Sequence, residues 1–147
     1  LGDKMEENNK MEVSLSTLLT PSKTVTIDYP EFEGFSVDIC YLSREELLKL
    51  RNKSVSQKLN KRTRAFEEVL DQEKFLQVYV QQVIKGWKGL KYKYLEKLLL
   101  VDVSKLNSED ELSYTQENAE LLMKNSENFD SWIAETIGDL ENFTQVK

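Results

Sequence analysis

Few side chains in this sequence could carry out chemistry. The 147 residues include one cysteine, Cys40, and no histidine, which excludes Ser-His and Cys-His catalysis and every histidine-based metal site. Cys40 lies in the apolar, strand-like run VDICYL, where we expect a buried, reduced thiol with no role in activity. A single cysteine cannot form an internal disulfide, which fits a reducing compartment.

Adjacent carboxylates occur at Glu45/Glu46 and at Glu67/Glu68, in segments that favour helices. Neighbouring positions on a helix point in different directions, so these pairs predict solvated helix faces rather than an acid–base pair. The chain has only five glycines and no glycine-rich phosphate-binding motif. We therefore expect a protein that is not an enzyme and that binds no cofactor and no metal.

The most strongly charged stretch is residues 51–64, which carry six Lys and Arg residues and no acid. It has no aromatic residue on which a base could stack, and the net charge of the whole chain is −6, which argues against nucleic acid as the main partner. Two interpretations remain. The stretch is a solvated connector, or it is an electrostatic landing site for an acidic partner, contacted through Lys58, Lys61 and Arg62.

The length fits one domain with a sizeable core. We expect a flexible N-terminal segment over residues 1–23 and a single α-rich domain over residues 24–147. No apolar run approaches the roughly 18 residues that span a bilayer, and the N-terminus lacks the pattern of a signal peptide. These features predict a soluble globular protein with no membrane partner.

The domain begins with a strand pattern. Apolar residues alternate with polar ones on both sides of PEFEG, which predicts a β-hairpin over residues 25–39. Ser43 and Glu46 then form an S-x-x-E capping box, so a helix should start at Arg44.

Residues 65–86 have the clearest helical periodicity, because apolar side chains recur near one face from Phe66 to Ile84. Phe75 and Tyr79 add a second stripe one turn apart. An apolar arc of this width predicts one long central helix that is contacted from two sides.

The stretch KGWKGL, residues 85–90, places an indole between two glycines at the predicted helix end. Gly86 is a natural residue to end a helix, so Trp87 should pack at this corner against the final helix, near Trp132 or Phe143. The alternative is that Trp87 is exposed and anchors a partner helix, because indoles are frequent binding hot spots.

The C-terminal third is ambiguous at first and then helical. Tyr92 and Tyr94 alternate with lysines as in a strand, whereas YLEKLLL could be a helix. Thr115 predicts the N-cap of a helix over residues 116–126 that buries Ala119, Leu122 and Met123. A final apolar stripe predicts a helix over residues 127–143.

Together these segments predict an α-rich α+β fold in which an N-terminal β-hairpin packs on a small bundle of about four helices. The predicted structural core consists of Phe66, Leu70, Val80, Ile84, Trp87, Leu122, Trp132, Ile133 and Phe143. The candidate partner-binding residues are Lys58, Lys61, Arg62, Tyr79, Tyr92 and Tyr94.

The order of these segments resembles the tail assembly chaperones of long-tailed, siphovirus-like bacteriophages over about residues 24–143. The resemblance rests on Gly86–Trp87–Lys88–Gly89, on Tyr114–Thr115 followed by Glu117–Asn118–Ala119, on Leu122 and on Asn142–Phe143. The stretch 92–112 departs from the family, because it is longer and more apolar than the loop expected there.

The resemblance implies a role in tail morphogenesis and no catalysis. Such a chaperone binds the phage tape measure protein, keeps its long apolar helices soluble in the host cell cytoplasm, and is absent from the finished virion. The tail tube protein is a second possible partner, and self-association is a further possibility. The alternative is a small structural or regulatory protein-binding module, such as a virion component or a host-factor inhibitor.

Overall fold

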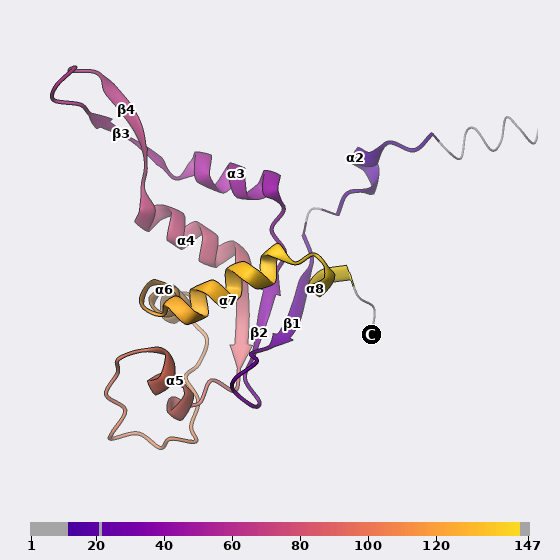
Figure 1. Cartoon of the computed structure of the whole chain (residues 1–147), viewed down its shortest axis with the longest axis vertical. Coiled ribbons are helices and arrows are strands. Elements are labelled where there is room, and N and C mark those ends of the chain that lie inside the picture. The colour runs from indigo at the N-terminus through magenta and orange to yellow at the C-terminus, as the bar shows by residue number, and fades with distance from the viewer. Residues whose placement is uncertain (1–11, 21, 145–147) are drawn as a thin grey trace, which may run out of the picture.

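The computed structural model describes residues 12–20 and 22–144 (Figure 1). Its centre is a three-stranded antiparallel sheet in the order β1-β2-β5, formed by β1 (Thr24–Asp28), β2 (Ser36–Cys40) and β5 (Ile84–Lys88). The strand alternation around PEFEG produces β1 and β2 with Ile27 opposite Val37, so the predicted N-terminal hairpin is confirmed. The middle strand β2 is buried almost throughout, which requires a strand partner on each edge.

Three helices pack together against this sheet (Figure 1). They are α4 (Gln72–Val83), α6 (Gln116–Asn125) and α7 (Glu127–Gly138). The core between the helices and the sheet contains the fully buried rings of Phe35 and Phe129, whose centroids are 6.4 Å apart.

Side-chain caps set where several helices begin. Ser43 accepts a hydrogen bond from the backbone N–H of Glu46 at 3.2 Å and starts α3 (Arg44–Lys53), as the capping box predicts. Thr115 does the same for α6, accepting from the N–H of Asn118 at 3.0 Å. These two predicted helix starts are confirmed, and so is the burial of Ala119, Leu122 and Met123 by α6.

A two-stranded hairpin projects from the body between α3 and α4 (Figure 1). It consists of β3 (Val55–Leu59) and β4 (Phe66–Leu70), and we call residues 55–70 the arm. Its loop is closed by Asn60, whose backbone N–H donates to Ala65 at 2.9 Å and whose side chain accepts from two loop N–H groups. At its base, the carbonyl of the buried Ser54 accepts from the N–H of Asp71 at 2.7 Å, so the two strands leave the body together.

The remaining elements are short. They are the exposed turn of helix α2 (Leu15–Leu18), then α5 (Tyr92–Leu98), which a long loop connects to α6, and finally α8 (Glu141–Thr144). The predicted flexible segment 1–23 and the single-domain boundary stay predictions, because residues 1–11 and 21 lie outside the described part.

The expected fold class is wrong. Instead of one N-terminal hairpin on a four-helix bundle, the described residues form a mixed α+β fold with seven helices and five strands in two antiparallel sheets, interleaved along the chain. Most of the error comes from residues 65–86, predicted as one helix. They form β4, α4 and the start of β5. Ile84 and Trp87 are buried in strand geometry because β5 supplies the second partner that β2 needs.

Two further corrections follow from local chemistry. The basic stretch 51–64 is not a connector, since Val55–Leu59 pair with Phe66–Leu70. The predicted helix 127–143 ends at Gly138, because Asp139 turns the chain and its carboxylate accepts from the N–H of Glu141 at 3.1 Å to start α8. Leu140, counted in the predicted stripe, lies in this break and is 54% exposed.

Candidate partner-binding surface

An open trough runs along α4, between α3 on one side and α6 and α7 on the other. We call it the α4 trough. Its wider part has a volume of about 530 Å³, and its apolar floor is formed by Leu47, Phe75, Leu76, Tyr79 and Ala134. The charged residues around this part are Arg51, Glu73, Lys124 and Asp130. This trough is an open, largely apolar recess of the kind that could receive a partner.

The trough exists because α4 is apolar on more than one side. Val80 and Val83 face the core and are fully buried, whereas Phe75 and Tyr79 lie one turn apart on another face and are only half-buried. Their ring centroids are 5.6 Å apart, and the guanidinium of Arg51 lies 5.4 Å from the Phe75 centroid. A cation above an aromatic ring adds modest stability and fixes the ring without covering its other side.

The pKa values of two groups in the trough are raised. Burial, helped by the charge of Asp130, raises the pKa of Tyr79 to about 12. Burial, helped by Glu127, also raises the pKa of the Asp130 carboxyl above its ordinary value. The shift of Tyr79 reflects its burial against the neighbouring apolar side chains of the floor.

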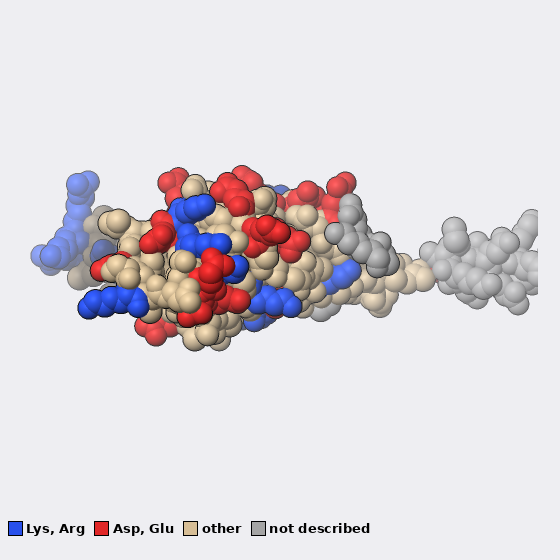
Figure 2. All heavy atoms as spheres, turned by 90° about the horizontal axis from the view of Figure 1, so that it is seen from below, with Lys and Arg blue, Asp and Glu red and all other residues tan. Residues whose placement is uncertain are grey.

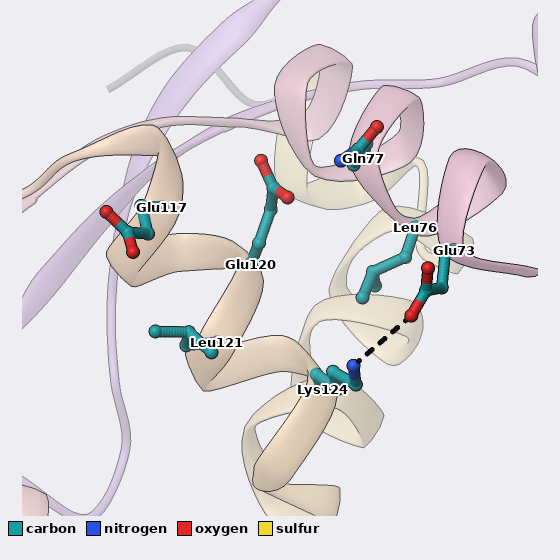
Figure 3. A pocket seen from close by; sticks show the side chains of 7 residues that line it. All are labelled: Glu73, Leu76, Gln77, Glu117, Glu120, Leu121 and Lys124. Atoms are coloured by element: carbon teal, nitrogen blue, oxygen red, sulfur yellow. Dashed lines mark ion pairs between the residues drawn. The ribbon is translucent and has the colours of Figure 1, made fainter.

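The trough continues into a narrower, acidic hollow of about 200 Å³ between α4 and α6 (Figure 3). Figure 3 shows Glu73 and Glu120 projecting from the two helices towards the space between them. Lys124 on α6 lies 3.7 Å from Glu73, and both side chains are largely exposed, so this pair contributes little to stability. Three acids and one lysine surround the hollow, which gives this end of the trough a negative charge.

The basic residues predicted to bind a partner all lie on the arm. Lys58 is on β3 directly opposite Glu67 of β4, and Lys61 and Arg62 are in the loop at the tip. Figure 2 shows basic side chains that project beyond the body at the end of the molecule where the arm lies. The arm also exposes apolar side chains, with Leu59 51% and Phe66 70% accessible. Core packing was predicted for Phe66 and is wrong, because its strand extends away from the sheet and helices.

The three predicted tyrosines fall in different places. Tyr79 lies in the α4 trough, whereas Tyr92 and Tyr94 lie on α5. The Tyr94 ring stacks on Phe32 at 4.7 Å and its hydroxyl donates to the Glu33 carbonyl at 2.7 Å, so it holds the β1–β2 loop. The structure therefore does not bring the six candidate residues into one site.

The other predicted core residues divide by burial. Those that are buried are Val80, Ile84, Trp87, Leu122, Ile133 and Phe143, while Leu70 and Trp132 are half-buried. The expected contact of Trp87 with Trp132 or Phe143 is replaced by packing against Tyr114, at 5.2 Å between ring centroids. The rings of Trp132 and Phe143 lie against Tyr29 and Tyr41 respectively.

Sequence reasoning missed Leu47 and Leu76 as parts of a surface, although the second stripe of Phe75 and Tyr79 pointed to this face of α4. Within residues 12–20 and 22–144, no group of three or more acidic or cysteine side chains is placed to hold a metal ion. No helix in the same ranges is both long and apolar enough to cross a membrane.

Comparison with protein families decides the origin of the chain. A family model described as YdaY prophage protein matches residues 43–147, which is more than half of the chain. The chain belongs to the YdaY prophage protein family. It is thus a protein of phage origin, a coarser assignment than the tail assembly chaperones that it resembles. No curated protein and no solved structure matches the sequence of this YdaY-family chain.

Proposed function

We propose that this YdaY-family protein is a tail assembly chaperone that binds the phage tape measure protein and keeps it soluble during tail morphogenesis. The observation that carries the proposal is the α4 trough. Half-buried Phe75, Leu76 and Tyr79 form its floor, and the residues of α4 that line it run from Gln72 to Tyr79, about 10 Å of helix. A groove of this length suits about two turns of an amphipathic client helix, which binds through apolar side chains at i, i+3, i+4 and i+7.

Charge supports the same role. The chain is acidic, with a net charge of −6, and a coat of like-charged copies would keep a long apolar client in solution by mutual repulsion. Each contact can be weak, because a long client offers repeated sites, and a weak coat can be removed when the tail tube assembles. The proposed role is non-enzymatic, needs no cofactor, and takes place in the host cell cytoplasm before the virion is complete.

Co-expression with the tape measure protein of the same prophage tests the proposal. The client alone should be insoluble, and with this protein it should become soluble and co-purify with many copies of it. Phe75→Ala, in the trough floor, should reduce the soluble client at least about tenfold if the ring contributes about 1.4 kcal/mol at each site. Leu106→Ala, a 49% exposed loop residue away from the trough, is the matched control and should behave as the parent.

Two results would reject the chaperone. If the client stays insoluble in the presence of the parent protein, the protein does not have the proposed solubilising activity. Recovery of the protein in purified tails would instead identify a virion component, which is the alternative role.

A further inference from the structure

The arm has an apolar face that no described element of the same chain covers. Cross-strand partners lie on one side of a hairpin, so Val55 and Leu70 share a face with Leu59 and Phe66, and Gln57 and Glu68 lie between these two apolar pairs. Val55, Leu59 and Phe66 are 37%, 51% and 70% exposed. A lone two-stranded hairpin is at best marginally stable in water and needs something to pack on its apolar face.

Charge separates the arm from the rest of the molecule. The arm holds four basic and two acidic residues, a net charge of +2, whereas the other 131 residues hold 16 basic and 24 acidic residues, a net charge of −8. Its four basic residues are Lys58, Lys61, Arg62 and Arg64, on β3 and in the loop that follows it. The partner of the arm should therefore be apolar where it meets Leu59 and Phe66, and acidic beside the basic tip.

The α4 trough has this pattern. Its wider part is floored by Phe75, Leu76 and Tyr79, and its narrower end carries Glu73 and Glu120 (Figure 3). The lining of the trough on α4 runs from Gln72 to Tyr79, about 10 Å. A five-residue strand of the arm extends about 17 Å, so the outer part of the arm, with Leu59 and Phe66, is the part that fits.

We propose that two copies of this chain form a dimer by exchanging arms, each arm lying in the α4 trough of the other copy. The apolar face of the arm would cover Phe75 and Tyr79, and Lys61 and Arg62 would lie against Glu73 and Glu120. The trough begins where the chain's own arm ends, since α4 follows β4 directly. The two contacts are identical, so together they close a two-fold dimer.

A second copy is favoured over an unrelated protein because one chain supplies both complementary surfaces. The inference does not depend on the proposed chaperone role, since it concerns the protein without any client. In a chaperone, arm exchange would cover the trough until a client competes for it.

Charge reversal with a complementary swap tests the dimer. Light scattering of the purified full chain at low salt should give twice the monomer mass of 17.2 kDa. The tip variant Lys61→Glu/Arg62→Glu and the trough variant Glu73→Lys/Glu120→Lys should each weaken association by about 100-fold and run as monomers, because each opposes like charges. Mixed in equal amounts they should dimerise again, because each contact then joins opposite charges.

The control variant is Lys97→Glu/Lys105→Glu, which changes the net charge as much as the tip variant does, but on α5 and the loop after it. It should remain dimeric. Circular dichroism of every variant should match the parent, since these side chains are exposed or at the surface. A second variant, Phe66→Gln, removes the apolar contact without changing charge and should also give monomers.

Three outcomes would overturn the proposal. One is a parent protein that stays monomeric up to about 100 μM, a concentration at which a dimer with a Kd near 10 μM would form. Another is a dimer that persists in both reversal variants, which would place the interface elsewhere. The third is a mixture of the two variants that remains monomeric.

Discussion

Trp87 closes the junction between the central sheet and the long loop before α6, and its replacement should destabilise the whole fold. It lies on β5 opposite Val37 of β2 and is 8% exposed. Its indole N–H donates to the Leu112 carbonyl at 2.9 Å, and its ring meets Tyr114 edge-on at 5.2 Å. Tyr114 in turn donates its hydroxyl to the Ile84 carbonyl at 2.9 Å, so the ring pair ties the loop to the same strand.

The expected magnitude follows from these contacts. Truncating a buried tryptophan to alanine costs about 3–5 kcal/mol, out of a total stability of about 5–15 kcal/mol. At about 2–4 °C per kcal/mol for a chain of this size, Trp87→Ala should lower the Tm by about 6–20 °C. Trp87→Phe keeps a ring against Tyr114 but loses the hydrogen bond to Leu112, and should cost about 1–2 kcal/mol.

The assay is thermal unfolding followed by circular dichroism, beside co-purification with the tape measure protein. Leu106→Ala, which changes an exposed loop residue, provides the control and should melt with the parent. If Trp87→Ala melts like the parent and yet loses the client, Trp87 is an exposed binding anchor and the structural reasoning fails. An unstable Trp87→Ala beside a nearly normal Trp87→Phe is the result that supports it.

Three further predictions concern single positions. Cys40 is 2% exposed, so Cys40→Ala should lower the free energy of unfolding, measured in urea, by about 1–2 kcal/mol and leave client binding unchanged. Loss of client binding by the folded variant would contradict a purely structural role of the thiol. Gly89 has φ +81°, and a Cβ there would lie 1.9 Å from the Gly34 carbonyl oxygen. Gly89→Ala should therefore lower the free energy of unfolding by more than about 2 kcal/mol. A variant with the urea midpoint of the parent would refute this close approach. The pKa of Tyr79 is raised to about 12, so its contribution to stability is complete below pH 10 and is lost as the pH rises towards 12. Tyr79→Phe should therefore lose less stability than the parent between pH 9 and pH 11, and equal losses would show that Tyr79 does not cause them.

Local signals predicted the elements that depend on neighbouring residues alone. Ser43 and Thr115 start α3 and α6 through hydrogen bonds that reach three residues along the chain, and such bonds can be anticipated from residue types. The β1–β2 hairpin was equally predictable, since its apolar alternation is read within one stretch. The caps and turns of this chain can thus be predicted from short stretches of consecutive residues.

The division of residues 65–86 could not be read in the same way. Apolar residues at Val80, Val83, Ile84 and Trp87 fit a helical face, and the same residues fit a helix that gives way to a strand. What decides between the two is β2, a buried strand more than forty residues earlier that needs a second hydrogen-bonding partner. Periodicity within one window contains no information about that need.

The arm and the trough were missed for a related reason. One feature of the sequence indicates the arm, namely the charge pair of Lys58 and Glu67, but these residues can be paired only after the strand register is known. The trough combines side chains from α3, α4, α6 and α7, and none of these helices carries a motif of its own there. Phe75 and Tyr79 have the residue types of a core, and they stay half-exposed because no other described element covers them fully.

The residues that the family model matches and the residues that form the fold begin at different positions, and the difference has a physical reason. The match begins at Ser43, after β1 and β2, yet β5 inside the matched region pairs with β2 from Ser36 to Ile39. Without β2, the backbone groups of β5 would lose their partners, and α4 and α7 would lose the strand that both of them contact. A strand satisfies these needs with its backbone and an apolar face, which many sequences provide. The packed faces of α4, α6 and α7 must also fit one another, so they restrict the sequence more. In this chain, therefore, the folding unit extends N-terminal to the matched region and includes the hairpin of β1 and β2.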